Sequence, residues 1–169
     1  MVASAFLPVT IYKGQLLFLF GKEAHDDSAP GFSDFGGGVK SGEDIYLAGL
    51  REFAEETTGF FGDAKELNEM VKKSGGIYPF VDDEYHIHIF KMNYDPKLPE
   101  YFNRSHKFVA ERMDTKVLRK SMIFEKVEIQ WMTVSEMRRR RREFRPFYRK
   151  ILDRIISEVP QIREFIRTR

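Results

Sequence analysis

The chain has no cysteine among its 169 residues. This absence excludes disulfide bonds, a cysteine-ligated zinc finger and a thiol nucleophile, and it favours a reducing compartment. Long hydrophobic runs are also missing, because none approaches the roughly 18 residues of a membrane span. Met1 is not followed by the basic region and long apolar segment of a secretion signal. These absences predict a cytoplasmic protein with no membrane partner.

The length fits one domain, 1–169, that can build its core without a metal or a disulfide. The formal net charge is only +2, but it is unevenly distributed. Residues 138–169 carry 12 Lys or Arg and 4 Asp or Glu, a net charge of +8, whereas residues 1–137 carry a net charge of −6. An acidic body with a basic end suggests separate roles for the two parts.

Apolar and alternating segments predict strands at 5–12, 15–20, 85–90 and 127–132. The polar, glycine-rich stretch 21–42 is too long for a tight turn, and we interpret it as a candidate functional loop. A second helical pattern starts at Ser135 and reaches the C-terminus, with interruptions near Pro146 and Pro160. Strands mixed with a few helices, without a repeated βαβ series, predict an α+β or α/β sandwich.

Residues 43–57 predict a helix, with Ser41 as its N-cap and Gly59 as its stop signal. At roughly 100° per residue, the apolar residues of this helix form one stripe that should face the core. The expected core stripe consists of Tyr46, Leu47, Leu50, Phe53 and Ala54.

Three glutamates, Glu52, Glu55 and Glu56, lie on nearly the opposite side of the same helix. Their mutual repulsion costs a few tenths of a kcal/mol per pair, roughly. The positions one turn away that could neutralise them, Ala48 and Gly59, are uncharged. A hard divalent cation such as Mg²⁺ would remove the repulsion. The alternative is an ordinary solvated helix surface.

The sequence around these glutamates favours the site. A glycine-rich loop runs directly into the helix, and the backbone of such a loop can approach a phosphate or a metal closely. Arg51 follows Glu43 by eight residues, where an ion pair could tie the loop to the helix.

This stretch resembles the Nudix box, G-x5-E-x7-R-E-U-x-E-E-x-G-U, in which U is a bulky apolar residue. The residues that match are Gly37, Glu43, Arg51, Glu52, Phe53, Glu55 and Glu56. The closing glycine of the box would fall on Thr58, but Gly59 arrives one residue late, which suggests an extra residue at the helix C-terminus. The resemblance implies an α/β fold, an αβα sandwich with a mixed sheet. The charge count and the helical pattern add a basic helical segment at 135–169 to this single domain.

The resemblance also implies hydrolysis of a nucleoside diphosphate derivative with Mg²⁺ or Mn²⁺. Carried over by position, the metal ligands would be Glu52, Glu55, Glu56 and the carbonyl of Gly36. Glu52 and Glu55 would also be catalytic, and Arg51 would hold Glu43 and orient the helix.

Members of the family differ in their general base, which can be a box glutamate or a residue outside the box. Glu125 is our candidate outside it, because it precedes Trp131 by six residues, similar to a glutamate before a final strand in mRNA-decapping Nudix enzymes. Glu128 is the neighbouring competitor. Glu125 could instead be a solvent-exposed carboxylate at a strand edge.

The entry to the box, Phe32-Ser-Asp-Phe-Gly-Gly-Gly, resembles Nudix proteins of large DNA viruses. Some of these remove mRNA caps, and others hydrolyse diphosphoinositol polyphosphates, which would place this protein in a host cytoplasm. Phe32 and Phe35 could stack on a base, although aromatic residues beside a loop more often pack in the core. We predict that Gly37 and Lys40 also bind substrate.

The basic end contains the run 138–142. We predict that Arg138, Arg139 and Arg142 bind an RNA backbone or a highly phosphorylated ligand, because the guanidinium fork matches phosphate oxygens. The alternative is a solvated helix that balances the acidic body.

These features leave several functions open. The leading one is hydrolysis of the 5′ cap of mRNA, with capped RNA bound through the basic segment. Dinucleoside polyphosphates, nucleotide sugars and diphosphoinositol polyphosphates are alternative substrates of the same chemistry. A catalytically silent Nudix module that binds RNA is the alternative of another class, but the complete set of glutamates argues against it.

Overall fold

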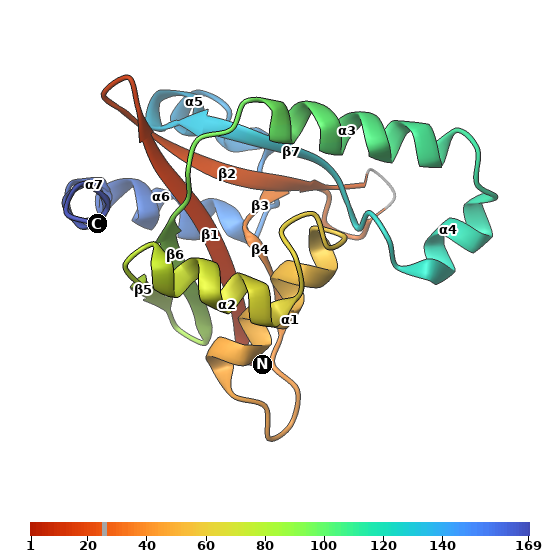
Figure 1. Ribbon diagram of the computed structural model, residues 1–169, viewed down its shortest axis with the longest axis horizontal. Coiled ribbons are helices and arrows are strands. Elements are labelled where there is room, and N and C mark those ends of the chain that lie inside the picture. Colours follow the sequence, from red (N-terminus) through yellow and green to blue (C-terminus); the bar gives the residue numbers. More distant parts are fainter. Residues whose placement is uncertain (25–26) are drawn as a thin grey trace.

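The computed structural model describes residues 1–24 and 27–169, and in them one mixed sheet forms the centre of the molecule (Figure 1). Its strands are β1 (Ala3–Tyr12), β2 (Gln15–Glu23), β3 (Gly31–Ser33), β4 (Phe35–Gly38), β5 (Ile77–Asp82), β6 (Tyr85–Lys91) and β7 (Lys126–Thr133). The order is β3-β2-β1-β6-β5, while β4 pairs with β1 and β7 pairs with β2. Only β1 and β6 run parallel among these pairs; the others are antiparallel.

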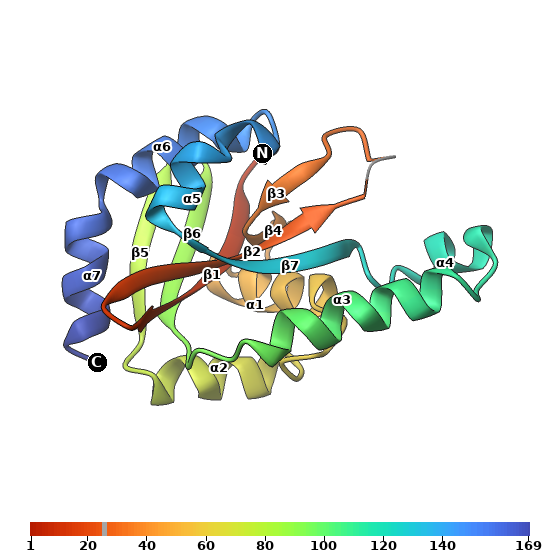
Figure 2. The ribbon, with the colours of Figure 1, turned by 90° about the horizontal axis from the view of Figure 1, so that it is seen from above.

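Helices cover both faces of this sheet (Figure 2). They are α1 (Ile45–Glu56), α2 (Ala64–Lys73), α3 (Lys97–Ala110), α4 (Thr115–Ser121), α5 (Val134–Arg139), the short 3-10 helix η1 (Arg141–Glu143), α6 (Tyr148–Ser157) and α7 (Val159–Arg167). α1, α2 and α3 lie on one face, and α5, α6 and α7 lie on the other. The expected αβα sandwich is therefore confirmed.

Alternation along the strands builds a separate core on each face. Phe6 and Leu19 point into the core beneath α1 and α2, together with Phe53 of α1. Their neighbours Leu7 and Phe18 point into the core beneath α6 and α7. All five are fully buried, and each such side chain contributes about 1.5–3 kcal/mol to folding. The sheet is thus a rigid layer between two packed faces.

The four predicted strands are confirmed, but the interpretation of 21–42 as one long loop is wrong. β2 continues to Glu23, and β3 and β4 lie within this stretch. Residues 25 and 26, also part of it, lie outside the described residues. The stretch forms strands despite its glycines because its backbone pairs with β1 and β2.

The N-terminal end of α1 differs from the sequence prediction. The N-cap is Asp44 rather than Ser41: its carboxylate accepts a hydrogen bond of 3.0 Å from the backbone N–H of Leu47. At the other end Thr58 and Gly59 both have positive φ, which accommodates the extra residue. Leu47 is also 55% exposed and does not join the core stripe.

The C-terminal segment is a series of short helices rather than one long helix. The chain is extended at Phe144, and the backbone N–H of Arg145 donates to the carbonyl of Phe32. Pro146 follows this extended stretch, and Pro160 lies in the first turn of α7, where a missing N–H is tolerated. In the part of the chain that the structure describes, no helix has the length and apolar character needed to cross a membrane.

Candidate functional site

Arg51 joins the loop before α1 to the helix itself. Its Nε and Nη2 donate to the two oxygens of Glu43, at 2.8 and 3.0 Å, and Nη2 also donates to the carbonyl of Gly38 at 3.2 Å. Its Nη1 lies 2.5 Å from Glu52 Oε1 and 3.2 Å from Glu55 Oε2. One guanidinium therefore fixes the loop and gathers two carboxylates. The expectation that the glutamates have no neutralising neighbour is wrong, because Arg51 bridges two of them.

The hydrogen bonds from Arg51 hold the pKa of Glu43 down at about 2, assisted by the backbone N–H of Lys40. Conversely, the Glu43 carboxylate raises the pKa of Arg51. Both groups are thus charged over the whole physiological pH range, so the ion pair that joins the loop to the helix does not depend on pH there.

β4 lies directly against the carboxylate face of α1. A Cβ on Gly37 would overlap the carboxylate of Glu52, so any other residue there would push this carboxylate aside. The backbone N–H of Gly36 donates to Glu56 Oε2 at 2.8 Å. The glycines predicted from the sequence thus act by permitting this close approach.

Glu56 is buried, unlike Glu55, whose side chain is 53% exposed. Oε1 of Glu56 lies 3.3 Å from Nζ of Lys126, a fully buried lysine that the sequence analysis did not identify. Burial raises the pKa of Glu56, and the ammonium of Lys126 opposes that rise. Burial disfavours the ammonium as well, but the carboxylates of Glu56 and Glu23 raise the pKa of Lys126 overall.

Lys126 also donates to Glu23 Oε1 at 2.6 Å and to Ser33 Oγ at 3.0 Å. Only strand pairing brings these groups together, since Lys126 stands opposite Glu23 across β2 and β7. In the sequence both residues stand at strand ends, Glu23 as the last residue of β2 and Lys126 as the first of β7, where a charged residue is ordinary, so no local signal pointed to them.

The donor set fits a divalent cation in part. Glu52 and Glu55 each direct an oxygen at Nη1 of Arg51, and Mg²⁺ is usually held by one or two carboxylates together with substrate phosphates. Among the described residues, no group of three Asp, Glu, His or Cys side chains assembles a metal site. Glu56 is engaged by Gly36 and Lys126, and the expected set of three glutamate ligands stays a prediction.

Glu125 faces the carboxylate helix across a cavity of about 550 Å³, which Glu55, Thr58 and Ile123 also line. Burial raises the pKa of Glu125, and the negative charges of Glu23, Glu52 and Glu55 add to the rise. Its competitor Glu128 instead pairs with Lys22 on the sheet, at 3.7 Å.

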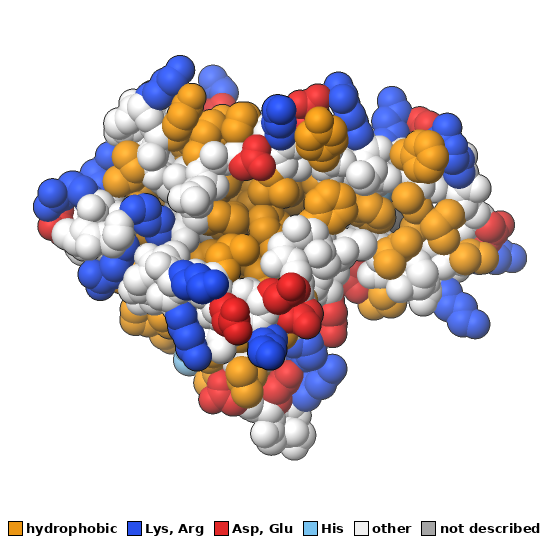
Figure 3. Space-filling model, in the orientation of Figure 1, with side chains coloured by type: hydrophobic (Ala, Val, Ile, Leu, Met, Phe, Trp, Pro, Cys, Tyr) orange, Lys and Arg blue, Asp and Glu red, His pale blue; other side chains and the backbone are white. Residues whose placement is uncertain are grey.

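A larger cavity of about 860 Å³ lies on the other side of Glu125. Its walls are mostly apolar and include Leu118, Phe124 and Val127, with His106 beside them. α3 and α4, which form part of its wall, extend away from the body of the molecule (Figure 2). In the space-filling view, acidic and basic side chains gather over α1 and α2, and apolar side chains line the hollow between them and α3 (Figure 3).

The predicted role of Phe32 and Phe35 in base stacking is wrong. Both rings are fully buried: Phe32 packs on Phe144, and Phe35 packs on Phe53. Neither can offer a face to a ligand. Lys40 is exposed, and its backbone N–H donates to Glu43 at 2.9 Å.

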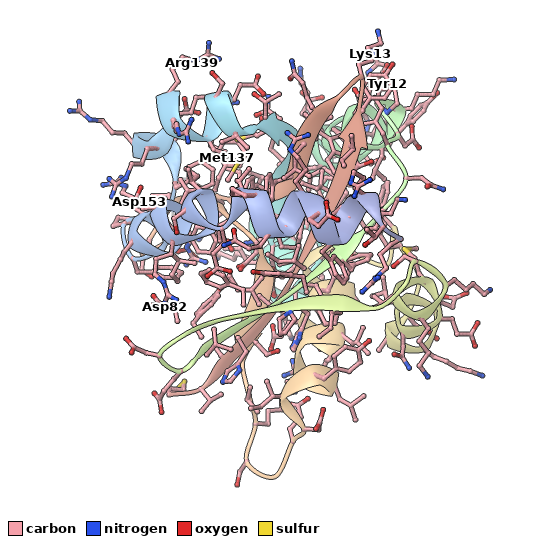
Figure 4. All side chains as sticks on the ribbon, turned by 90° about the vertical axis from the view of Figure 1, so that its left-hand side faces the viewer. Tyr12, Lys13, Asp82, Met137, Arg139 and Asp153 are labelled. Carbon is pink, nitrogen blue, oxygen red and sulfur yellow. The ribbon has the colours of Figure 1, made fainter. Side chains whose placement is uncertain are left out.

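The basic segment is not beside the carboxylates. Figure 4 shows Arg139 on α5, directed away from the end of the molecule where α1 lies. Arg138, Arg139 and Arg142 are exposed. By contrast, Arg140 pairs with Glu143 at 2.7 Å, and other arginines of the segment are similarly engaged. The run is therefore divided between exposed arginines and arginines that pair with carboxylates, and phosphate binding by the exposed ones stays a prediction.

No protein-family model and no curated protein sequence matches this chain. Solved structures do match it. One is a C. elegans Ap4A hydrolase crystallised as a binary complex, which is 12% identical to this chain. The match covers 94% of this chain and 97% of the hydrolase chain, with a TM-score of 0.52. The NUDIX domain of Shewanella oneidensis NrtR, crystallised with ADP ribose, is 11% identical, with coverages of 95% and 86% and a TM-score of 0.51. The likeness concerns the fold: this chain folds as a Nudix domain.

Proposed function

We propose that this protein is a Nudix hydrolase that cleaves a pyrophosphate linkage in a nucleoside diphosphate derivative, using Mg²⁺ or Mn²⁺. The observation that carries this proposal is the convergence of Glu52 and Glu55 on a helix that Arg51 locks to Glu43. Glu125 faces the same cavity as Glu55. Carboxylates gathered at this density have little structural purpose, because α1 is already anchored by Leu50 and Phe53 in the core.

A divalent cation bound there would neutralise phosphate charge and supply Lewis acidity. In this proposal Glu52 and Glu55 hold the cation together with the carbonyl of Gly36. Glu56 holds the backbone of Gly36 in place from its buried position. The reaction joins a water oxygen to phosphorus and breaks the bond from phosphorus to the bridging oxygen. A carboxylate oxygen of Glu125 takes the proton that the water loses, and its raised pKa makes it a stronger base than an ordinary glutamate.

The two cavities would each receive one end of such a substrate. The 550 Å³ cavity between Glu55 and Glu125 would receive the phosphates, and the 860 Å³ cavity would receive the uncharged part of the substrate. Its mostly apolar lining suits a flat organic group better than a phosphate.

The direct test is turnover with Mg²⁺ on a panel of capped RNA, free cap analogue, dinucleoside polyphosphate, nucleotide sugar and diphosphoinositol polyphosphate. Glu55→Gln should abolish turnover and leave the fold intact, because Glu55 is half exposed and lies outside the core. Glu69→Gln, an exposed glutamate of α2, is the matched control and should retain activity. Full activity of Glu55→Gln would remove Glu55 from the mechanism.

Within this class we propose the 5′ cap of mRNA as the substrate. The supporting feature is the exposed set Arg138, Arg139 and Arg142, on a surface that could hold an RNA chain leading away from the cap. Binding of capped RNA should weaken steeply with salt, because each neutralised phosphate releases counterions. Changing all three arginines to Ala should weaken RNA binding. A matched change of Lys65, Lys72 and Lys73 on α2 should leave RNA binding unchanged.

A free nucleotide is the second candidate, favoured by what the two similar structures are named for, Ap4A hydrolysis and ADP-ribose binding. The arginine substitutions separate the two candidates, since a free dinucleotide is too short to need the face of α5. Salt-sensitive RNA binding with no turnover of any substrate would instead support a catalytically silent RNA-binding module.

A further inference from the structure

Lys126 is a charged residue whose side chain is buried inside the protein. It opens β7 and stands opposite Glu23 of β2, with its side chain 1% exposed. An ammonium group has three donors. All three have partners here: Glu23 Oε1 at 2.6 Å, Ser33 Oγ at 3.0 Å and Glu56 Oε1 at 3.3 Å.

Glu56 is occupied by the protein on both of its oxygens. Oε1 faces Lys126, and Oε2 accepts from the backbone N–H of Gly36 at 2.8 Å. Its side chain is only 5% exposed. Glu52 and Glu55 have no cation of their own: they share the single guanidinium of Arg51 with Glu43, and Glu55 is half exposed.

The difference matters for a divalent cation. A cation that approached Glu56 would have to displace a buried ammonium or tolerate its repulsion, which a low-dielectric interior screens poorly. Arg145 adds a second positive charge, since its Nη1 lies 3.1 Å from Glu23 Oε1. Two cations from within the chain thus already face Glu23 and Glu56.

We propose that Lys126 is a positioning residue that acts as an internal counter-ion for Glu56 and confines a divalent cation to Glu52 and Glu55. The consequence for catalysis rests on the proposed function: a pair of carboxylates binds the free cation weakly, so the cation enters together with the substrate phosphates. Glu56 then shapes the site through Gly36 and Lys126 rather than by direct coordination.

The test is binding of Mn²⁺ alone, measured by electron paramagnetic resonance without substrate. Lys126→Met should tighten Mn²⁺ binding by about tenfold or more, because it removes one buried positive charge and frees Glu56. Lys22→Met is the matched control, since it removes a partly exposed cation that pairs with Glu128 and should leave Mn²⁺ affinity unchanged. Unchanged or weaker binding in folded Lys126→Met would overturn the proposal.

Glu56→Gln provides a second measurement. In the otherwise natural chain it should barely change Mn²⁺ affinity, whereas in the Lys126→Met background it should abolish the gain. The double variant also replaces both members of the buried pair by neutral groups, so it should fold even where Lys126→Met does not. A large loss of Mn²⁺ affinity in Glu56→Gln alone would show that Glu56 is itself a ligand.

These outcomes are independent of turnover. Hydrolysis of a nucleotide combined with no tightening in Lys126→Met would refute the role of Lys126 and leave the proposed function standing. Tightening of Mn²⁺ binding combined with no hydrolysis of any substrate would do the reverse.

Discussion

Glu43 and Arg51 form a two-pronged ion pair, in which Nε and Nη2 of the arginine each donate to a different oxygen of the glutamate. The pair connects a loop residue to the middle of α1, so it sets the direction in which the helix leaves the glycine strand β4. Because the same guanidinium also contacts Glu52 and Glu55, the geometry of the two carboxylates depends on it.

Arg51→Lys should therefore damage catalysis without unfolding the protein. A lysine keeps the charge but cannot make the two parallel bonds to Glu43. We expect kcat/KM to fall by about 10- to 100-fold, the usual cost of losing a group that orients metal ligands. Arg104→Lys is the control, because Arg104 makes only an exposed pair with Glu100. Equal losses in the two variants would contradict a special role for Arg51.

Gly36→Ala should destabilise the fold because β4 has no room for a side chain there. A Cβ on Gly36 would stand 2.5 Å from the carbonyl oxygen of Ser4. Overpacking of this kind costs about 1–3 kcal/mol, measurable by urea denaturation. Gly38→Ala is the control: its nearest neighbour would be the Met1 sulfur at 3.7 Å, so its free energy of unfolding should change little. Two curves that coincide would show that β4 adapts.

His88 should make the protein less stable in mild acid. Burial lowers the pKa of His88 to about 4, and His86 nearby adds to the effect while Asp44 opposes it. The unfolded chain, with a pKa of roughly 6.5, therefore binds more protons than the folded one between these values. The contribution of His88 to the free energy of unfolding is then fully present above pH 6.5 and is lost as the pH drops toward 4, whereas Asp34 and Glu56, whose pKa burial raises, contribute with the opposite sign.

The check is urea denaturation of His88→Gln and His86→Gln across that pH range. His88→Gln should flatten the pH dependence, because the titrating group is gone. His86→Gln, on the same strand but less buried, should keep most of the slope. A slope unchanged by His88→Gln would assign the acid sensitivity to the carboxylates.

Glu125→Gln should lower kcat by about 10²- to 10⁴-fold with little change in KM, if Glu125 is the general base. Glu128→Gln, three residues along the same segment, should be nearly silent because Glu128 pairs with Lys22 away from the cavity. Steady-state kinetics on the best substrate of the panel distinguish them. A normal kcat in Glu125→Gln would return the role to a box glutamate.

Local patterns were enough to predict a large part of the fold. The strands β1, β2, β6 and β7 follow from apolar or alternating residues, and α1 follows from its helical periodicity. β3 and β4 could not be predicted, because short glycine-rich segments become strands only when β1 and β2 offer them partners. Phe32 and Phe35 show the same limit: a ring in a polar stretch can face a ligand or the core, and only packing decides.

The sequence by itself determined the pattern of the site, since Glu43, Arg51, Glu52 and Glu55 interact at separations fixed by one loop and one helix. Tertiary structure alone decided the surroundings. Lys126 reaches Glu56 from 70 positions further along the chain, through the pairing of β7 with β2. Electrostatics in the interior depend on which distant charges are brought within a few ångströms, and this is why an acidic body and a basic end could be counted from the sequence but not placed.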